Sequence, residues 1–296
     1  MRGYFTVGIS EKDLSIVIPA KDELQGLRGL LPDIIENFPL AEIIVVNDGS
    51  VDGSDELISK YDVIEVKHLY PMGNGASLKS GARAASRKWI VFMDGDAQHD
   101  VSSVKKIIDD LGKGYDMVVG ARSWSGHAGA GRGLANSLYN KLASWMVGHK
   151  VHDLTSGLRG VKRGKFLDFC YLYPNGFSCP TTSTMAFFRA GYSVNYIPVN
   201  VHKRLGNSHI KPIKDGLRFL LIIFKIGTLY SPLKIFAPVA FLQFLLGMSY
   251  YIFTWIQYGR FTNMSVILFL SAMTVFLIGL VSEQITNLMY KDVDHK

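Results

Sequence analysis

The carboxylates with the clearest chemical use lie in residues 94–100, directly after the apolar run of residues 89–93. Asp94 and Asp96 are two positions apart, so at the end of a strand they share a face and can bind one divalent cation together. Mg²⁺ and Mn²⁺ need few carboxylate ligands, because phosphate and water oxygens complete their coordination shell. The segment therefore predicts a metal site. The competing interpretation is a solvated strand end, in which Asp100 caps the helix that follows.

Polar segments follow two earlier apolar runs in the same way. Residues 19–23 and residues 47–54 both contain carboxylates. Acidic ends of neighbouring strands can bind the donors of a nucleobase and the hydroxyls of a ribose, although each segment alone could be an ordinary turn. A glycine-rich segment, residues 73–81, contains Lys79 and leads into a helix. Its backbone N–H groups and its lysine could meet a phosphate group.

The elements that must position these segments alternate along the chain. Short β-rich runs are separated mostly by helical stretches, which predicts an α/β domain with a mostly parallel sheet covered by helices. The runs are residues 14–18, 42–46, 63–66, 89–93 and 117–119. Ligands of such sheets bind at the carboxyl ends of the strands, which is where the polar segments fall.

The last part of the chain has a different composition. Residues 235–257 and 264–285 are almost free of charge and long enough to cross a bilayer, so they predict a transmembrane hairpin in place of two buried core helices. Basic residues flank the pair, and the connecting loop carries only Arg260. By the positive-inside tendency, both chain ends and the domain before the hairpin face the cytoplasm.

These patterns divide the 296 residues into three parts. Residues 1–209 are expected to form a cytoplasmic domain, residues 210–231 amphipathic helices in the membrane interface, and residues 232–290 the hairpin. A third span within residues 210–230 is the alternative, but basic residues bracket too few apolar ones there. The net charge of +7 is concentrated before the hairpin, which favours membrane lipid and phosphate partners over nucleic acid.

Two further observations concern the compartment. The first 13 residues contain no apolar core of signal-peptide length, which agrees with a domain that is not exported. The chain has only two cysteines, Cys170 and Cys179, which cannot form a disulfide framework and are expected to be reduced.

The order of the motifs resembles a known family. Residues 15–23, 44–54, 73–81 and 93–100 resemble the donor-binding half of the inverting family-2 glycosyltransferases, which have the glycosyltransferase-A (Rossmann-like) fold. Two later segments, residues 153–159 and 204–208, resemble motifs of the branch that glycosylates polyprenyl phosphates, the dolichyl-phosphate mannose synthase type.

The resemblance implies a role for individual residues. The donor site would be formed by Pro19, Ala20, Glu23, Asp48, Lys79 and Asp94. The metal, Mg²⁺ or Mn²⁺, would be held by Asp94, Asp96 and Gln98. The acceptor phosphate would be bound by Arg122, Arg132, Arg204 and Ser208. The catalytic residues would be Asp96, Asp153 and Arg122.

The implied reaction moves one hexose from a UDP- or GDP-sugar to a polyprenyl phosphate, undecaprenyl or dolichyl, with inversion and with the help of the metal. Such an acceptor is already anionic, so catalysis needs positioning more than a strong base. Members that act on hydroxyls usually supply an acid where residues 180–184 of this chain contain no carboxylate. Asp153 is then the best candidate for a carboxylate near the reacting centre, as base or as orienting group.

Two other functions compete with this one. A processive polysaccharide synthase would need a Gln-x-x-Arg-Trp motif and more spans, and the sequence has neither. A catalytically silent membrane adaptor would keep the fold without the chemistry. The charged set of Asp94, Asp96, Arg122 and Arg204 argues against an adaptor, because nothing structural requires these charges together.

Overall fold

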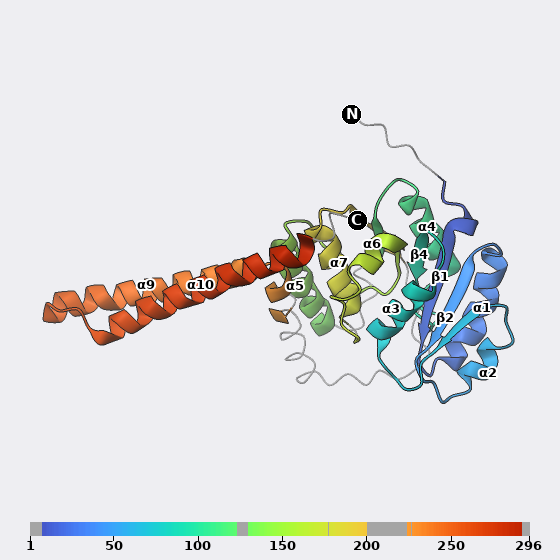
Figure 1. Ribbon diagram of the computed structural model, residues 1–296, viewed down its shortest axis with the longest axis horizontal. Coiled ribbons are helices and arrows are strands. Elements are labelled where there is room, and N and C mark those ends of the chain that lie inside the picture. The colour runs from blue at the N-terminus through green and yellow to red at the C-terminus, as the bar shows by residue number, and fades with distance from the viewer. Residues whose placement is uncertain (1–7, 123–129, 177, 200–223, 226, 292–296) are drawn as a thin grey trace. The chain divides into compact units, whose positions relative to one another are not determined.

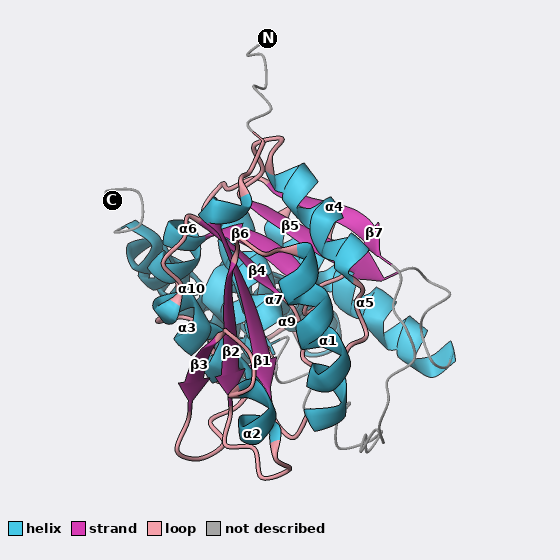
Figure 2. Ribbon diagram, turned by 90° about the vertical axis from the view of Figure 1, so that its right-hand side faces the viewer, coloured by secondary structure: helices cyan, strands magenta, loops and turns pink. Residues whose placement is uncertain are grey.

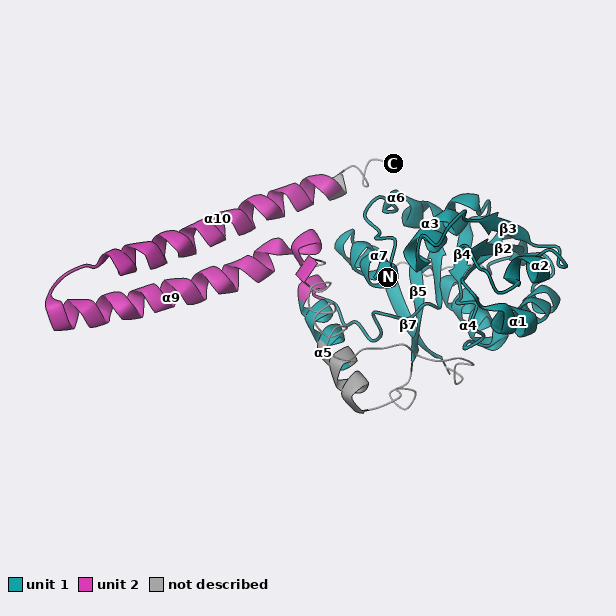
Figure 3. Ribbon diagram, turned by 90° about the horizontal axis from the view of Figure 1, so that it is seen from below, with its two compact units in different colours: residues 1–145, 149–209 teal, residues 146–148, 210–296 magenta. Residues whose placement is uncertain are grey.

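The computed structural model describes residues 8–122, 130–176, 178–199, 224–225 and 227–291 of the chain. The chain divides into two compact units (Figure 3). Unit 1 comprises residues 1–145 and 149–209, and unit 2 comprises residues 146–148 and 210–296.

A seven-stranded sheet forms the centre of unit 1 (Figure 2). Its strands are β1 (Leu14–Ala20), β2 (Glu42–Asn47), β3 (Ile64–Lys67), β4 (Trp89–Phe92), β5 (Met117–Arg122), β6 (Arg159–Lys162) and β7 (Val194–Val199). They lie in the order β3-β2-β1-β4-β6-β5-β7. Only β6 runs antiparallel to its neighbours, β4 and β5. The start of β6 therefore lies at the same edge of the sheet as the carboxyl ends of β4 and β5.

Helices cover both faces of this sheet (Figure 1). They are α1 (Leu24–Asn37), α2 (Ser54–Ile58), α3 (Asn74–Ala84), α4 (Val101–Leu111), α6 (Arg163–Asp168) and α7 (Cys179–Arg189). The short 3-10 helix η1 (Glu11–Asp13) precedes β1, and α5 (Ala130–Val147) follows β5 in the sequence. Parallel strands covered on both faces are apolar throughout. Every residue of β1 is buried accordingly.

The two faces of the sheet have separate packing. On one face, Ile16 and Ile18 of β1 join a core with Leu27 of α1 and Ile107 of α4. On the other face, Gly81 lets α3 approach β1 and β2 so closely that a Cβ would overlap the side chain of Val17. The alternation of side chains along each strand thus gives every strand two buried faces.

The five expected strands are present, and the sheet is mostly parallel as predicted. The sequence did not predict β6 or β7. β6 is four residues long with a single branched apolar residue, and β7 is an edge strand that contains Pro198, so neither has the apolar run that marks a central strand. The expected helix cap is also present, since Asp100 accepts a hydrogen bond from the backbone N–H of Ser103 at 2.8 Å.

Unit 2 contains an antiparallel pair of long helices, α9 (Pro232–Tyr258) and α10 (Asn263–Lys291), drawn in orange and red in Figure 1. Both are long and apolar enough to cross a membrane, and most of their side chains are exposed within the unit. The predicted hairpin is therefore confirmed, with helices that extend slightly beyond the two expected spans.

Small residues at intervals of seven line the contact between α9 and α10. The seam consists of Ala240, Gly247 and Thr254 on α9 and of Ser265, Ala272, Gly279 and Thr286 on α10. A Cβ on Gly279 would lie 2.6 Å from the Cβ of Phe236, so the two backbones approach as closely as a glycine permits. Large side chains of the facing helix, Phe236, Leu268 and Phe269, pack directly against the two seam glycines.

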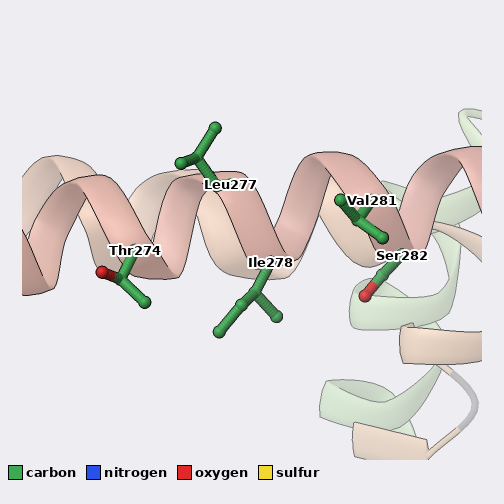
Figure 4. A pocket seen from close by; sticks show the side chains of 5 residues that line it. All are labelled: Thr274, Leu277, Ile278, Val281 and Ser282. Carbon is green, nitrogen blue, oxygen red and sulfur yellow. The ribbon is translucent and has the colours of Figure 1, made fainter.

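A shallow hollow lies on the exposed side of α10 (Figure 4). It is lined by Thr274, Leu277, Ile278, Val281 and Ser282. None of these side chains can titrate or bind a metal, so the hollow offers no reactive chemistry.

The expected interfacial helices, residues 210–231, lie mostly outside the described residues, as does most of the segment considered for a third span. Within the described part, Phe224, Lys225 and residues 227–230 are helical.

Asp116 links three segments of unit 1 and provides a test of the fold. It is 8% exposed and accepts hydrogen bonds from Lys162 at 2.6 Å and from the backbone N–H of Ser193 at 3.0 Å, and it also pairs with Lys165. Burial acts to raise the pKa of Asp116, but the hydrogen bonds from the two lysines outweigh it and hold the pKa below its ordinary value.

We expect Asp116→Asn to lower the free energy of unfolding by roughly 1–3 kcal/mol at neutral pH. A lowered folded-state pKa stabilises the protein above the ordinary Asp value of about 4, and this contribution is lost as the pH falls through the folded pKa. Unfolding of wild type and variant at pH 7 and in acid should therefore show a difference that shrinks in acid. Asp109→Asn, at an exposed position of α4, is the control, and an equal loss in both variants would contradict the assignment.

Candidate active site

The acidic loop after β4 packs against the start of α1. A Cβ on Gly26 of α1 would overlap the carbonyl oxygen of Gly95, so a glycine is needed for this approach. Ala97 has a φ of +56°, a left-handed conformation that turns the chain toward α4. The backbone N–H of Gln98 donates to Asp96 at 3.1 Å. Asp94, Asp96 and Gln98, the three predicted metal ligands, thus belong to one tight loop.

The segment before β6 presses directly on Asp94. A Cβ on Gly157 would lie 2.7 Å from the Cγ of Asp94 and still closer to one of its carboxylate oxygens. Burial, reinforced by the neighbouring carboxylate of Asp96, raises the pKa of Asp94 to about 6, while the guanidinium groups of Arg159 and Arg122 act in the opposite direction. Two crowded carboxylates of this kind are stabilised by a cation.

The donor set fits a divalent metal that shares its ligands with a substrate. Among the residues that the structure describes, no group of three or more His, Cys, Asp or Glu side chains could hold an ion. The predicted protein ligands would be Asp94 and Asp96 with Gln98, and phosphate and water oxygens would complete the shell. Mg²⁺ and Mn²⁺ accept such a shell.

Arg122, at the end of β5, is held by Asp153 in a two-pronged ion pair. Its Nε and Nη2 donate to the two carboxylate oxygens at 2.8 and 3.0 Å, and Nη2 also donates to Thr155. Asp153 is 1% exposed. Burial acts to raise the pKa of Asp153, but the hydrogen bonds and charge of Arg122 outweigh it and hold the pKa below its ordinary value. Asp153 is therefore an ionised carboxylate that fixes the orientation of Arg122.

Asp48, at the end of β2, fixes the segment that leads into α3. Its carboxylate accepts hydrogen bonds from the backbone N–H groups of Met72 and Gly73, both at 2.8 Å, and lies 2.6 Å from Nδ1 of His68. Nε2 of His68 lies 2.9 Å from the hydroxyl of Ser80. Sequence reasoning missed His68, although a single histidine two residues after the expected strand 63–66 was the available signal. The nucleoside contact expected of Asp48 stays a prediction beside this structural role.

The glycine-rich segment packs against another loop of unit 1. Gly73 has a φ of +102°, and a Cβ there would lie 2.6 Å from the carbonyl oxygen of Asn175. The backbone N–H of Ala76 donates to the same oxygen at 3.0 Å, and the ammonium group of Lys79 donates to the carbonyl of Tyr173 at 3.0 Å. Close backbone packing therefore explains why glycines occur in this segment. The predicted contact of Lys79 with the sugar donor stays a prediction.

The ends of β1 and β2 are joined by side-chain to backbone hydrogen bonds. Asp22 accepts from the N–H of Val51 at 2.9 Å, and Asp52 accepts from the N–H of Leu24 at 2.8 Å. The backbone of Pro19 also lies close to Gly95, and the carbonyl of Ala20 accepts from Asp48 at 2.9 Å. The structure thus brings predicted donor residues Pro19, Ala20, Glu23 and Asp48 to the edge where Asp94 lies.

The acceptor residues are only partly described. Arg122 lies at this edge, and the backbone of Arg132 belongs to α5. Arg204 and Ser208 lie outside the described residues. Arg159, a fully buried arginine behind the site, was not singled out from the sequence as a functional residue.

Comparison with known proteins shows the family of the chain. The family "Glycosyl transferase family 2" matches residues 15–169, which is more than half of the chain, and "GtrB C-terminal hairpin" matches residues 231–288. The chain belongs to glycosyl transferase family 2. The predicted family and the predicted glycosyltransferase-A fold are both confirmed. The two apolar helices, together with the hairpin match, indicate association with a membrane.

Several relatives have been named. Two come from Haloferax volcanii: "Glycosyltransferase AglJ" is 25% identical over 81% of this chain and 82% of its own length, and "Dolichyl-phosphate hexose transferase" is 28% identical over 69% and 89%. "Polyprenol monophosphomannose synthase" of Mycolicibacterium smegmatis is 24% identical over 64% and 77%.

Among solved structures, glucosyl-3-phosphoglycerate synthase from Mycobacterium tuberculosis, in complex with Mn²⁺, UDP and phosphoglyceric acid, superimposes with a TM-score of 0.60. The match covers 72% of this chain and 78% of that one at 18% identity, which shows a shared fold.

The contact between Gly157 and Asp94 gives a test of the metal site. A methyl group at residue 157 must displace the Asp94 carboxylate, so we expect Gly157→Ala to weaken Mn²⁺-dependent binding of a nucleoside diphosphate by about tenfold or more. Calorimetric titration of the purified full-length protein with UDP or GDP measures this. Gly164→Ala in α6 is the control, because a Cβ there meets no atom within 4 Å. Equal binding by all three proteins would contradict the metal assignment.

Proposed function

We propose that the protein transfers one hexose from a UDP- or GDP-hexose to a polyprenyl phosphate, with inversion at the anomeric carbon and dependence on Mg²⁺ or Mn²⁺. The observation that carries the proposal is the placement of the Asp94 and Asp96 carboxylates near a guanidinium group that Asp153 holds in a fixed orientation. The carboxylates of Asp94 and Asp96 suit a metal-bound diphosphate, and the guanidinium group of Arg122 suits a phosphate acceptor. The names of two relatives given above, a dolichyl-phosphate hexose transferase and a polyprenol monophosphomannose synthase, support this substrate class.

Asp94 and Asp96 would bind the metal, with Gln98 as a further ligand. The bound metal supplies charge neutralisation for the departing nucleoside diphosphate. Binding of UDP and Mn²⁺ by a protein of the same fold supports this assignment.

Arg122 would bind the acceptor phosphate through the part of its guanidinium that Asp153 leaves available. Nε and both donors of Nη2 are used on Asp153 and Thr155, and Nη1 reaches no acceptor among the described residues. An oxygen of the acceptor phosphate then attacks the anomeric carbon, and the bond to the diphosphate breaks on the opposite face of the sugar. The phosphate is already an anion, so no proton has to be removed, and Asp153 acts by orientation.

The membrane arrangement belongs to the same proposal. Residues 1–209 form the catalytic domain at the cytoplasmic face, residues 210–231 lie in the interface, and residues 232–290 anchor the chain. Lys203, Lys211, Lys214 and Arg218 precede the hairpin in the sequence, which supports this orientation. Arg204 and Ser208 are close to them in the sequence, and anionic lipid attracts such basic residues. Arg132 would add to the acceptor site from α5.

Sugar transfer by the detergent-purified protein tests the reaction. The assay combines a panel of UDP- and GDP-sugars with undecaprenyl or dolichyl phosphate and Mg²⁺ or Mn²⁺. We expect a metal-dependent glycolipid product from one donor, and a loss of about a hundredfold or more in Asp96→Asn. Metal-dependent nucleotide binding without any product would contradict the acceptor assignment, and absence of both would favour the adaptor.

Asp153→Asn tests the orienting role. The amide keeps the shape but removes the charge that holds Arg122, so we expect kcat to fall by about a hundredfold while the Kd of the nucleoside diphosphate changes by about twofold or less. An unchanged turnover rate would remove Asp153 from the site. Asp62→Asn, in the exposed segment before β3, is the matched control.

A further inference from the structure

Arg159, the first residue of β6, is a buried cation behind the candidate site. Its side chain is 1% exposed. Nη1 donates to the carbonyl of Pro180 at 2.7 Å and to the hydroxyls of Ser183 at 2.7 Å and Thr184 at 3.1 Å, and Nη2 donates to the carbonyl of Ser156. Every one of these acceptors is neutral.

Arg159 has no direct counter-ion in the part of the chain that the structure describes. None of the described carboxylates lies within ion-pair distance of it, and its Nε is buried without a hydrogen-bond partner there. Burial lowers the pKa of Arg159, but an arginine retains its proton in folded proteins. A positive charge therefore persists in the interior, and a buried charge is tolerated only where opposite charge compensates it.

The compensating charge lies at the active-site edge. Ser156, whose carbonyl binds Arg159, is followed by Gly157, which contacts the carboxylate of Asp94. Asp153, three residues before Ser156, is buried and ionised. One short segment thus connects the buried cation to the carboxylates of the site.

We propose that the unpaired charge of Arg159 makes the site selective for an anionic acceptor: it strengthens binding of the acceptor phosphate and weakens binding of a metal ion that arrives without the diphosphate. This inference rests on the proposed function. The three carboxylates of the site would otherwise repel a phosphate and attract a free cation. A unit charge acting over about 10 Å at an effective dielectric of about 20 changes the affinity for another unit charge roughly tenfold.

A pair of isosteric substitutions isolates this charge. Ser183→Asp places a carboxylate beside Nη1 and neutralises Arg159 by a direct ion pair, whereas Ser183→Asn has the same shape without the charge. Thr184→Asp and Thr184→Asn repeat the comparison at a second residue that binds the same nitrogen. Thermal unfolding of the full-length protein checks that each variant folds.

We expect opposite shifts for the two kinds of ligand. Relative to the Asn variant, the Asp variant should bind free Mn²⁺ about tenfold more tightly, measured by electron paramagnetic resonance without nucleotide, and its KM for polyprenyl phosphate should rise about tenfold. The KM for the nearly neutral complex of Mn²⁺ with the nucleotide-sugar should change by about twofold or less.

If Arg159 only supported the fold, the Mn²⁺ affinity and the KM values of the Asp and Asn variants would change in a different way. If the Asp and Asn variants weaken all ligands equally, or if free Mn²⁺ binds them with the same affinity, the inference is wrong. If the Asp variants at both positions fail to fold while the Asn variants fold, Arg159 does not provide a usable cation, and the inference is again wrong. The Mn²⁺ titration needs no product, so it tests the effect of Arg159 on the free metal ion even if the transfer assay refutes the proposed acceptor.

Discussion

The candidate site depends on the contact between the backbone of Gly157 and the carboxylate of Asp94. Because β6 runs antiparallel between β4 and β5, the segment before it arrives at the carboxyl ends of both neighbours. Gly157 allows that segment to lie against the loop after β4 without displacing it. The same segment carries Asp153 to Arg122 and places Arg159 in the interior. One reversed strand thus joins the half of the site that would bind the metal to the half that would bind the acceptor.

The site keeps its charges out of water and in fixed positions. Asp153 and Arg159 are almost fully buried, and Asp94 and Arg122 are partly so. Charges held in a region of low dielectric interact strongly and need no reorganisation when a substrate arrives. At the end of β2, the hydrogen bonds of Asp48 with His68 and with the backbone of Met72 likewise fix the position of the segment that leads into α3. Positioning by buried charge suits transfer to an acceptor that is already an anion.

Local patterns predicted the parts of the molecule that depend on local sequence. The apolar runs predicted five strands, and the acidic segment after residue 93 predicted the helix cap Asp100. Contacts between distant segments were not predictable in this way. Nothing near Gly157 indicates that it must lie against Asp94, and nothing near Asp48 shows that His68 and the backbone of residues 72–73 occupy its carboxylate. The glycines of residues 73–81 suggested a phosphate loop, but only the tertiary structure shows that the backbone of Asn175 requires the space.

The seam between α9 and α10 restricts how the hairpin can change in length. Its small residues recur every seventh position on both helices, and at Gly279 a side chain would overlap the facing helix. Each residue added to an α-helix rotates all that follows by about 100°. Insertion of one residue in α9 would therefore rotate Leu or Phe side chains into the seam on one side of the insertion. Insertion of seven residues, about two whole turns, would nearly restore the spacing of the small residues. The thickness of membrane that this hairpin can match would thus vary in steps of about 10 Å rather than continuously.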